Sequence, residues 1–130
     1  LEGSTKERIH DGLLYILHHF TDGVEIESIN EKINYGTVLI LLTATGYSDY
    51  EVNRTVSQIG TDIGIFINGL VEDGKMKNEI RQDFSTKNIA ETLYIMYMGV
   101  QCFWLDFPNE DIDLIFEKNF EMTWQAIECH

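Results

Sequence analysis

The sequence predicts an all-α fold, and two general observations support this. The 130 residues include a single proline, so few positions interrupt a helix. No segment alternates apolar and polar residues for long enough to predict a half-buried strand. We therefore expect a single domain over residues 1–130, an antiparallel helical bundle of about five to six helices. Residues 1–4 could be an expression remnant.

The first helix is predicted to begin at Ser4. The run Ser4-Thr5-Lys6-Glu7 is a capping box, in which a hydroxyl and a carboxylate satisfy backbone amides at the start of a helix. Residues 21–23 interrupt the helix with a glycine. The face predicted to be buried consists of Ile9, Leu13, Ile16 and Phe20.

A second helix is predicted to start near Asp22 and Glu25. Its apolar positions are Ile26, Ile29 and Ile33. Residues 34–36 then predict a kink or a break. Residues 37–43 are rich in β-branched side chains, which also suit a buried strand. We expect a helix there, closed by Gly46, because a lone strand would lack partners for its backbone hydrogen bonds.

The helix with the clearest period follows a second capping box at residues 48–51. Its apolar stripe consists of Val52, Val56, Ile59, Ile63, Phe66 and Leu70. Gly60 and Gly64 flank the stripe, and each costs about 1 kcal/mol relative to alanine inside a helix. Close packing of another helix, or a bound ligand, is the expected compensation. Gly74 is predicted to end the helix.

Residues 85–107 predict a helix, capped by Ser85, that is apolar almost all the way round. An ordinary amphipathic helix carries one apolar stripe and a polar opposite face. One stripe here consists of Ile89, Leu93, Met96, Val100, Phe103 and Phe107. A second stripe consists of Ala90, Tyr94, Tyr97, Gln101 and Leu105. We expect the domain core to cover one face and a partner subunit or ligand to cover the other; a central helix wrapped by its own domain is the alternative.

The last helix follows a tight corner at Pro108. Asn109 is the predicted cap, and the acidic residues of the first turn suit the helix dipole there. One face consists of Ile112, Phe116, Phe120, Thr123 and Ile127. The last two helices therefore form a hairpin with more apolar surface than each can hide in the other.

The composition limits the classes of partner. With 22 acidic and 9 basic residues the formal net charge is −13, which opposes contact with nucleic-acid phosphates. Two cysteines do not make a disulfide framework in a chain of this length. The apolar run around Gln101 is too short to cross a bilayer, which needs about 20 residues. With no signal peptide evident, we expect a cytoplasmic protein without membrane association.

The motifs give no support for a catalytic or metal site. The run over residues 69–76 approaches a phosphate-binding loop, but Met76 replaces the hydroxyl residue that would hold magnesium. Leu114 stands where a calcium loop starting at Asn109 needs glycine. The histidines lack the spacing of ligands on one helix face, although His18 or His19 could hydrogen-bond a ligand. We expect no metal, no cofactor and no enzymatic activity.

Three stretches carry a resemblance to a known family. Residues 66–76 end a long helix in a glycine-containing turn, residues 83–93 lead from a short acidic connection into the next helix, and residues 99–105 carry the Gly and Trp of that helix. Together they resemble the C-terminal domain of TetR/AcrR-type transcription regulators. The resemblance covers about half of the chain.

The resemblance implies a small-molecule effector-binding and dimerisation domain of a transcriptional repressor. The implied dimer is a four-helix bundle made by the last two helices of each copy. The family binds DNA through an N-terminal helix-turn-helix, which is missing from this chain, and effector binding would misalign the paired recognition helices. The predicted dimer interface consists of Met98, Cys102, Leu105, Ile112, Ile115 and Met122.

Aromatic walls with few polar groups suit a small hydrophobic or aromatic effector. The predicted ligand-binding residues are Tyr15, His18, Phe66, Tyr94, Tyr97, Gln101 and Trp104. Core packing is the alternative role for each of these residues and for each interface residue.

Two other functions remain open at this stage. A helical protein-interaction module would use the exposed apolar hairpin to bind a different protein, and would form heteromers rather than a symmetric dimer. A cofactor-free or haem-binding helical enzyme is supported only by His18, His19 and the aromatic content.

Overall fold

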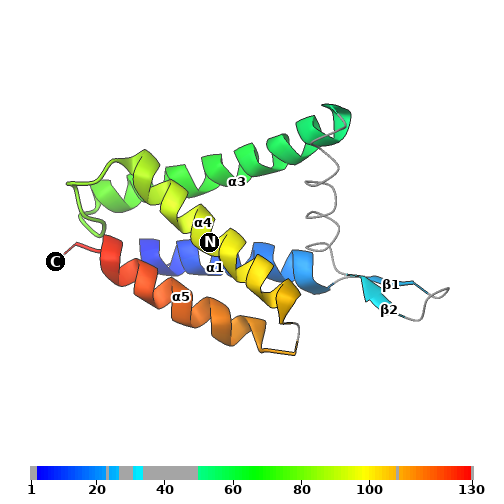
Figure 1. Ribbon diagram of the computed structural model, residues 1–130. Helices are drawn as coiled ribbons and strands as arrows, with labels where there is room; N and C mark the ends of the chain where they lie inside the picture. Colours follow the sequence, from blue (N-terminus) through cyan, green and yellow to red (C-terminus); the bar gives the residue numbers. More distant parts are fainter. Residues whose placement is uncertain (1–2, 23, 27–30, 34–49, 108, 130) are drawn as a thin grey trace.

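The computed structural model is a helical bundle with a small β-hairpin at one end (Figure 1). It describes residues 3–22, 24–26, 31–33, 50–107 and 109–129, and of these only the backbone at 19–22, 24–26, 31–33, 50–53, 55, 56 and 105. The helices are α1 (Thr5–Asp22), α3 (Tyr50–Met76), α4 (Thr86–Asp106) and α5 (Ile112–Ile127). The strands are β1 (Val24–Ile26) and β2 (Glu31–Ile33).

The predicted all-α class is confirmed for the packed body of the described chain, which is made of these helices. The helix expected over residues 37–43 lies outside the described residues, as do the capping serine at position 48 and Gly46. The predicted total of five to six helices therefore stays a prediction.

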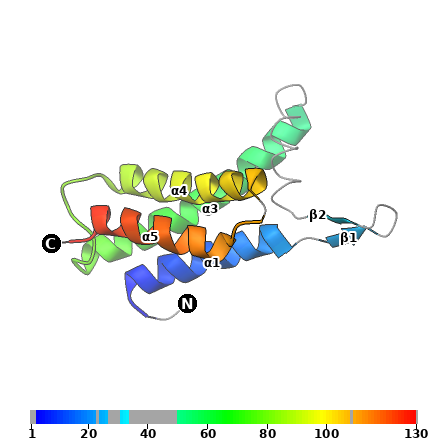
Figure 2. The same ribbon diagram turned by 60° about the horizontal axis from the view of Figure 1, so that its bottom comes forward.

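Helix α4 lies at the centre of the arrangement. It packs against α3 on one side and α5 on the other, while α1 contacts all three. Figures 1 and 2 both show α3 diverging from α4 and α5 toward its Tyr50 end. The helices therefore meet most closely around the second half of α3.

The core is built from one face of each helix. Its fully buried members include Leu13 of α1, Ile67 of α3 and Tyr97 of α4. In α5, Phe116 stacks on Phe120 with 5.7 Å between ring centroids. Periodic apolar residues of the kind that predicted the helices thus form a continuous interior.

Two of the predicted helix caps are confirmed. The Glu7 amide donates to Ser4 Oγ at 3.2 Å, and the Asn88 amide donates to Ser85 Oγ at 3.1 Å. These bonds satisfy amides that have no partner within the helix.

The cap predicted for the last helix was wrong. Helix α5 begins at Ile112 rather than just after Asn109, and Asp111 is its cap. Asp111 Oδ1 accepts from the Asp113 amide at 3.0 Å and from the Leu114 amide at 3.4 Å. A carboxylate at this position combines a hydrogen bond with a favourable interaction with the helix dipole, which explains why Asp111 prevails.

The helix predicted to start near Asp22 and Glu25 was also wrong. The chain forms an antiparallel pair in which Val24 lies opposite Ile33 and Ile26 opposite Glu31. The two strands are each other's hydrogen-bond partners. Val24, Ile26 and Ile33 are β-branched and favour extended backbone.

Gly74 does not end α3, which continues to Met76. The left-handed residue after the helix is Asn78, with a φ of 58°. A Cβ added to Gly74 would lie 2.7 Å from both Ile80 Cδ1 and Thr5 Cγ2. Gly74 is therefore required where the start of α1 and the connection after α3 pack directly on the helix.

That connection ties the chain together at this end of the bundle. The Thr5 amide donates to Glu79 Oε2 at 2.8 Å, and the Cys129 amide donates to the Glu79 carbonyl at 3.0 Å. The Arg81 amide donates to the Ile127 carbonyl at 3.0 Å. The beginning of α1 and the end of α5 are thus both anchored to the segment between α3 and α4.

Oppositely charged side chains connect α1 to α5 along their length. Lys6 Nζ lies 2.9 Å from Glu121 Oε2, and His10 Nε2 lies 2.7 Å from Glu117 Oε1. His10 also hydrogen-bonds Asp11 at 2.9 Å. Burial lowers the pKa of His10, but the hydrogen bonds to Asp11 and Glu117 outweigh it and raise this pKa above its ordinary value of 6.5.

We expect Gly74→Ala to lower the free energy of unfolding by about 1–3 kcal/mol, because the added methyl overpacks a filled contact. The matched control is Gly69→Ala in the same helix, where nothing lies within 4 Å of the added Cβ. That variant should gain about 0.5–1 kcal/mol from helix propensity. Urea unfolding measures both, and equal effects would contradict the packing assigned to Gly74.

The raised pKa of His10 predicts a pH-dependent stability. The folded state favours the protonated ring, so this contribution is fully present below pH 6.5 and is lost as pH rises through the raised folded pKa. Between about pH 6 and about pH 8, the melting temperature of the natural chain should therefore fall more than that of His10→Gln. Parallel melting profiles for the two proteins would refute this.

Candidate ligand site between α3 and α4

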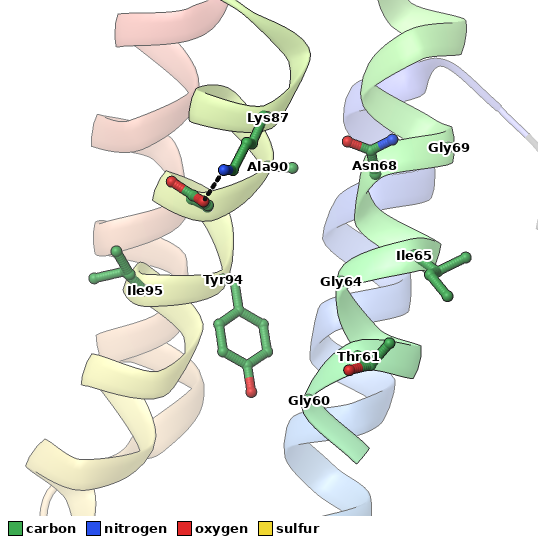
Figure 3. A pocket seen from close by; sticks show the side chains of 11 residues that line it. Gly60, Thr61, Gly64, Ile65, Asn68, Gly69, Lys87, Ala90, Tyr94 and Ile95 are labelled. Carbon is green, nitrogen blue, oxygen red and sulfur yellow. Dashed lines mark ion pairs between the residues drawn. The ribbon is translucent and has the colours of Figure 1, made fainter. Parts of the chain in front are cut away.

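An apolar groove of about 630 Å³ lies between α3 and α4 (Figure 3). Its volume is in the range of pockets that hold small organic ligands. Helix α3 lines it with Gly60, Thr61, Gly64, Ile65, Asn68 and Gly69. Helix α4 lines it with Lys87, Ala90, Glu91, Tyr94 and Ile95.

The glycines of α3 create this space. A Cβ at Gly64 or Gly69 would meet no atom within 4 Å, so neither glycine is needed for close helix packing. At Gly60 a Cβ would lie 3.3 Å from Tyr94 Oη, and Figure 3 shows that ring reaching from α4 toward α3. The sequence predicted that either close helix packing or a bound ligand offsets the cost of Gly60 and Gly64 in the helix. At Gly64 the structure fits the second option, because the position opens onto unfilled space.

Polar groups are few in the groove. Lys87 Nζ and Glu91 Oε1 lie 3.9 Å apart and form an ion pair within α4. Burial raises the pKa of Tyr94, which keeps its phenol protonated and able to donate. The Tyr94 hydroxyl and the Asn68 amide are therefore available to orient a ligand, whereas the Thr61 hydroxyl already donates to the Ser57 carbonyl at 2.9 Å and can only accept.

Two further polar side chains lie on the stripe of α4 that contains Tyr94. Tyr97 and Gln101 are both 0% exposed. Tyr97 Oη and both polar atoms of the Gln101 amide have no hydrogen-bond partner in the described part of the chain. The ring centroids of Tyr94 and Tyr97 are 6.3 Å apart, so the groove wall and this buried pair are neighbours.

The remaining predicted ligand residues lie elsewhere. Tyr15 is 74% exposed on α1, and His18 Nε2 donates to Asp113 Oδ1 at 2.6 Å, joining α1 to α5. Phe66 is half-buried and packs on the core, and Trp104 is half-buried near the end of α4. Tyr94 is thus the predicted residue that lines the groove, and Tyr97 and Gln101 follow it in the interior.

The two apolar stripes of α4 were expected to face different surroundings, but the centres of both are buried within this chain. Leu93 and Val100 of the first stripe are buried in the core, and Tyr97 and Gln101 of the second stripe are buried as well. The side of α4 left exposed carries Ile95, Gly99, Cys102 and Phe103. Of these, the sequence pattern placed Ile95, Gly99 and Cys102 on neither stripe.

A second groove, of about 590 Å³, lies between α4 and α5 on this exposed side. Ile95 and Phe103 line it from α4, and Ile115 lines it from α5. The rings of Phe103 and Phe107 are in contact, with 4.9 Å between their centroids and a tilt of 35° between their planes. Phe103 remains 45% exposed.

The predicted interface residues divide into two groups. Cys102 is exposed, and Met122 is 72% exposed. Met98, Ile112 and Ile115 are partly buried and pack on the core. The side chain of Leu105 lies outside the described residues.

No helix among the described residues is long and apolar enough to cross a membrane. Within the same residues, no three His, Cys, Asp or Glu side chains are grouped so that they could hold a metal ion.

Comparison with known proteins gives a match in structure but none in sequence. No family model and no curated protein matches this sequence. Among solved structures, the chain is similar to the crystal structure of a TetR transcriptional regulator from Chloroflexus aurantiacus J-10-fl, with a TM-score of 0.69 and 12% sequence identity. The fold is TetR-like. The match covers 100% of this chain and 63% of that regulator, so the chain spans less than two thirds of the regulator's length.

The groove predicts saturable binding of an uncharged hydrophobic dye such as Nile red. We expect Gly64→Leu to weaken this binding by at least about tenfold, because the new side chain occupies the groove. The control is Ser57→Leu, an exposed position on the same helix outside the lining, which should bind as the natural chain does. Fluorescence titration measures both, and equal affinities would exclude the groove as the binding site.

Proposed function

We propose that this chain is the effector-binding and dimerisation domain of a TetR-like transcriptional regulator, with the DNA-binding part outside these residues. The observation that carries the proposal is the match of the whole chain to part of a longer TetR regulator. The net charge of −13 supports it, because such a domain has no need to contact phosphates.

The proposed effector is a small, mostly apolar molecule that occupies the groove between α3 and α4. The glycines of α3 and Ala90 of α4 provide space and apolar surface. Tyr94 and Asn68 provide the few polar contacts that orient such a ligand.

The proposed dimer forms through the exposed side of α4 together with α5. In a symmetric dimer the same apolar patch meets its own copy, so one patch is sufficient to bury both. Ile95, Phe103 and Met122 are 68%, 45% and 72% exposed, and a four-helix bundle would cover them.

Helix α4 supplies a physical link between the two roles. It lines the ligand groove with Tyr94 and the groove on the α5 side with Phe103, and Ile95 lines both. A ligand that shifts α4 would therefore alter the geometry of the dimer. Binding at one site then favours one arrangement of the other, as allosteric coupling requires.

A helical protein-interaction module is the second candidate function. The same exposed residues of α4 and α5 favour it, because exposed apolar patches commonly mark protein contacts. The two functions differ in the partner, which is a second copy of this chain in one and a different protein in the other.

We expect the natural chain to sediment as a dimer and Phe103→Asp as a monomer, because two charges would be buried without partners in the symmetric contact. The control is Tyr15→Asp, which changes another exposed aromatic residue, on α1, and should leave the dimer intact. Analytical ultracentrifugation measures the masses. A natural chain that stays monomeric would contradict the proposed function, and an unchanged Phe103→Asp dimer would exclude this interface.

A further inference from the structure

The buried polar pair on α4 is a feature of the described chain that its folding does not explain, and it holds three of the five buried side-chain atoms that lack a hydrogen bond among the described residues. Tyr97 Oη, Gln101 Oε1 and Gln101 Nε2 are inaccessible and make no hydrogen bond among the described residues. Leaving such a group unpaired destabilises the fold, because the group loses its hydration and gains no partner. An apolar residue at position 101 would avoid that cost and fit the surrounding stripe.

Three unpaired atoms on two side chains one helical turn apart are better explained as a recognition site than as separate defects. Gln101 offers an acceptor and a donor on one planar amide, and Tyr97 adds a hydroxyl one turn earlier. Residues one turn apart lie on the same face of a helix, so these groups can reach a common ligand. The complementary ligand group is one that both donates and accepts.

The charge of that ligand group follows from its surroundings. Among the described residues, the buried side chains that carry polar groups are Thr5, Tyr97 and Gln101, and none of them is charged at neutral pH. A charged group placed beside Tyr97 and Gln101 would have no buried counter-charge there and would lose its hydration. An uncharged amide has the required donor and acceptor without this cost.

Resting on the proposed function, we propose that the effector carries an uncharged amide head, which Gln101 and Tyr97 bind inside the domain while its apolar remainder lies in the α3–α4 groove. Tyr94 separates the two regions, because it lines the groove and its ring neighbours that of Tyr97 at 6.3 Å between centroids. On this proposal, the half-buried Tyr94 side chain must rotate to let the head group pass from the groove to the amide of Gln101.

Isothermal titration calorimetry with three probes tests the proposal. The probes are decanamide, decanoate and decylammonium, which share an alkyl chain and differ in the head group. The natural chain should bind decanamide at least about tenfold more tightly than either charged probe. Gln101→Leu should weaken decanamide binding by at least about tenfold and leave Nile red binding unchanged. Tyr97→Phe should give a smaller loss, since it removes a single hydroxyl.

The controls separate recognition from folding. Gln101→Leu without ligand should melt no lower than the natural chain, because it removes an unpaired buried amide. Gln58→Leu, at an exposed position of α3, should bind decanamide normally. Equal binding of the three probes, or normal decanamide binding by Gln101→Leu, would overturn the proposal. If the natural chain binds Nile red but not decanamide, this inference alone fails; if it binds neither, the effector-binding role fails as well.

Discussion

The packing of α4 between α3 and α5 is the constraint on which the rest of the structure depends. Because α4 packs against both of these helices, both of its apolar stripes are buried at their centres, as Leu93 on one stripe and Tyr97 on the other show. The apolar residues left over, chiefly Ile95 and Phe103, then lie on the one side that neither neighbour covers. The same helix therefore belongs to the core, to the ligand groove and to the proposed dimer interface.

The packing of α4 against α3 also explains the position of the groove between these two helices. Gly64 and Gly69 of α3 line the groove at positions where an added Cβ would meet no atom within 4 Å, so the missing side chains leave open space. Where contact is complete, as at Gly74, the glycine is needed because neighbouring side chains occupy the room of a Cβ. Glycines in one helix thus have opposite roles, and the distance to the neighbouring element decides which role each has.

The sequence predicted those features that local chemistry determines. Ser4 and Ser85 cap their helices because their hydroxyls reach free amides. Ile63 and Leu70 of the predicted stripe are buried, and Phe66 between them is half-buried. The sequence failed where two local solutions compete, as between Asn109 and Asp111, or between helix and hairpin after α1. The sequence also could not predict that Ile95 and Tyr15 are exposed, because the exposure of such a residue depends on which faces the neighbouring helices cover.

The central claim is that occupancy of the groove changes the geometry of the dimer through α4. Pulsed electron paramagnetic resonance on the dimer tests this directly, with a spin label at Tyr15→Cys and both natural cysteines, Cys102 and Cys129, replaced. Saturating Nile red should shift the distribution of distances between the two labels. An unchanged distribution at saturation would contradict the claim.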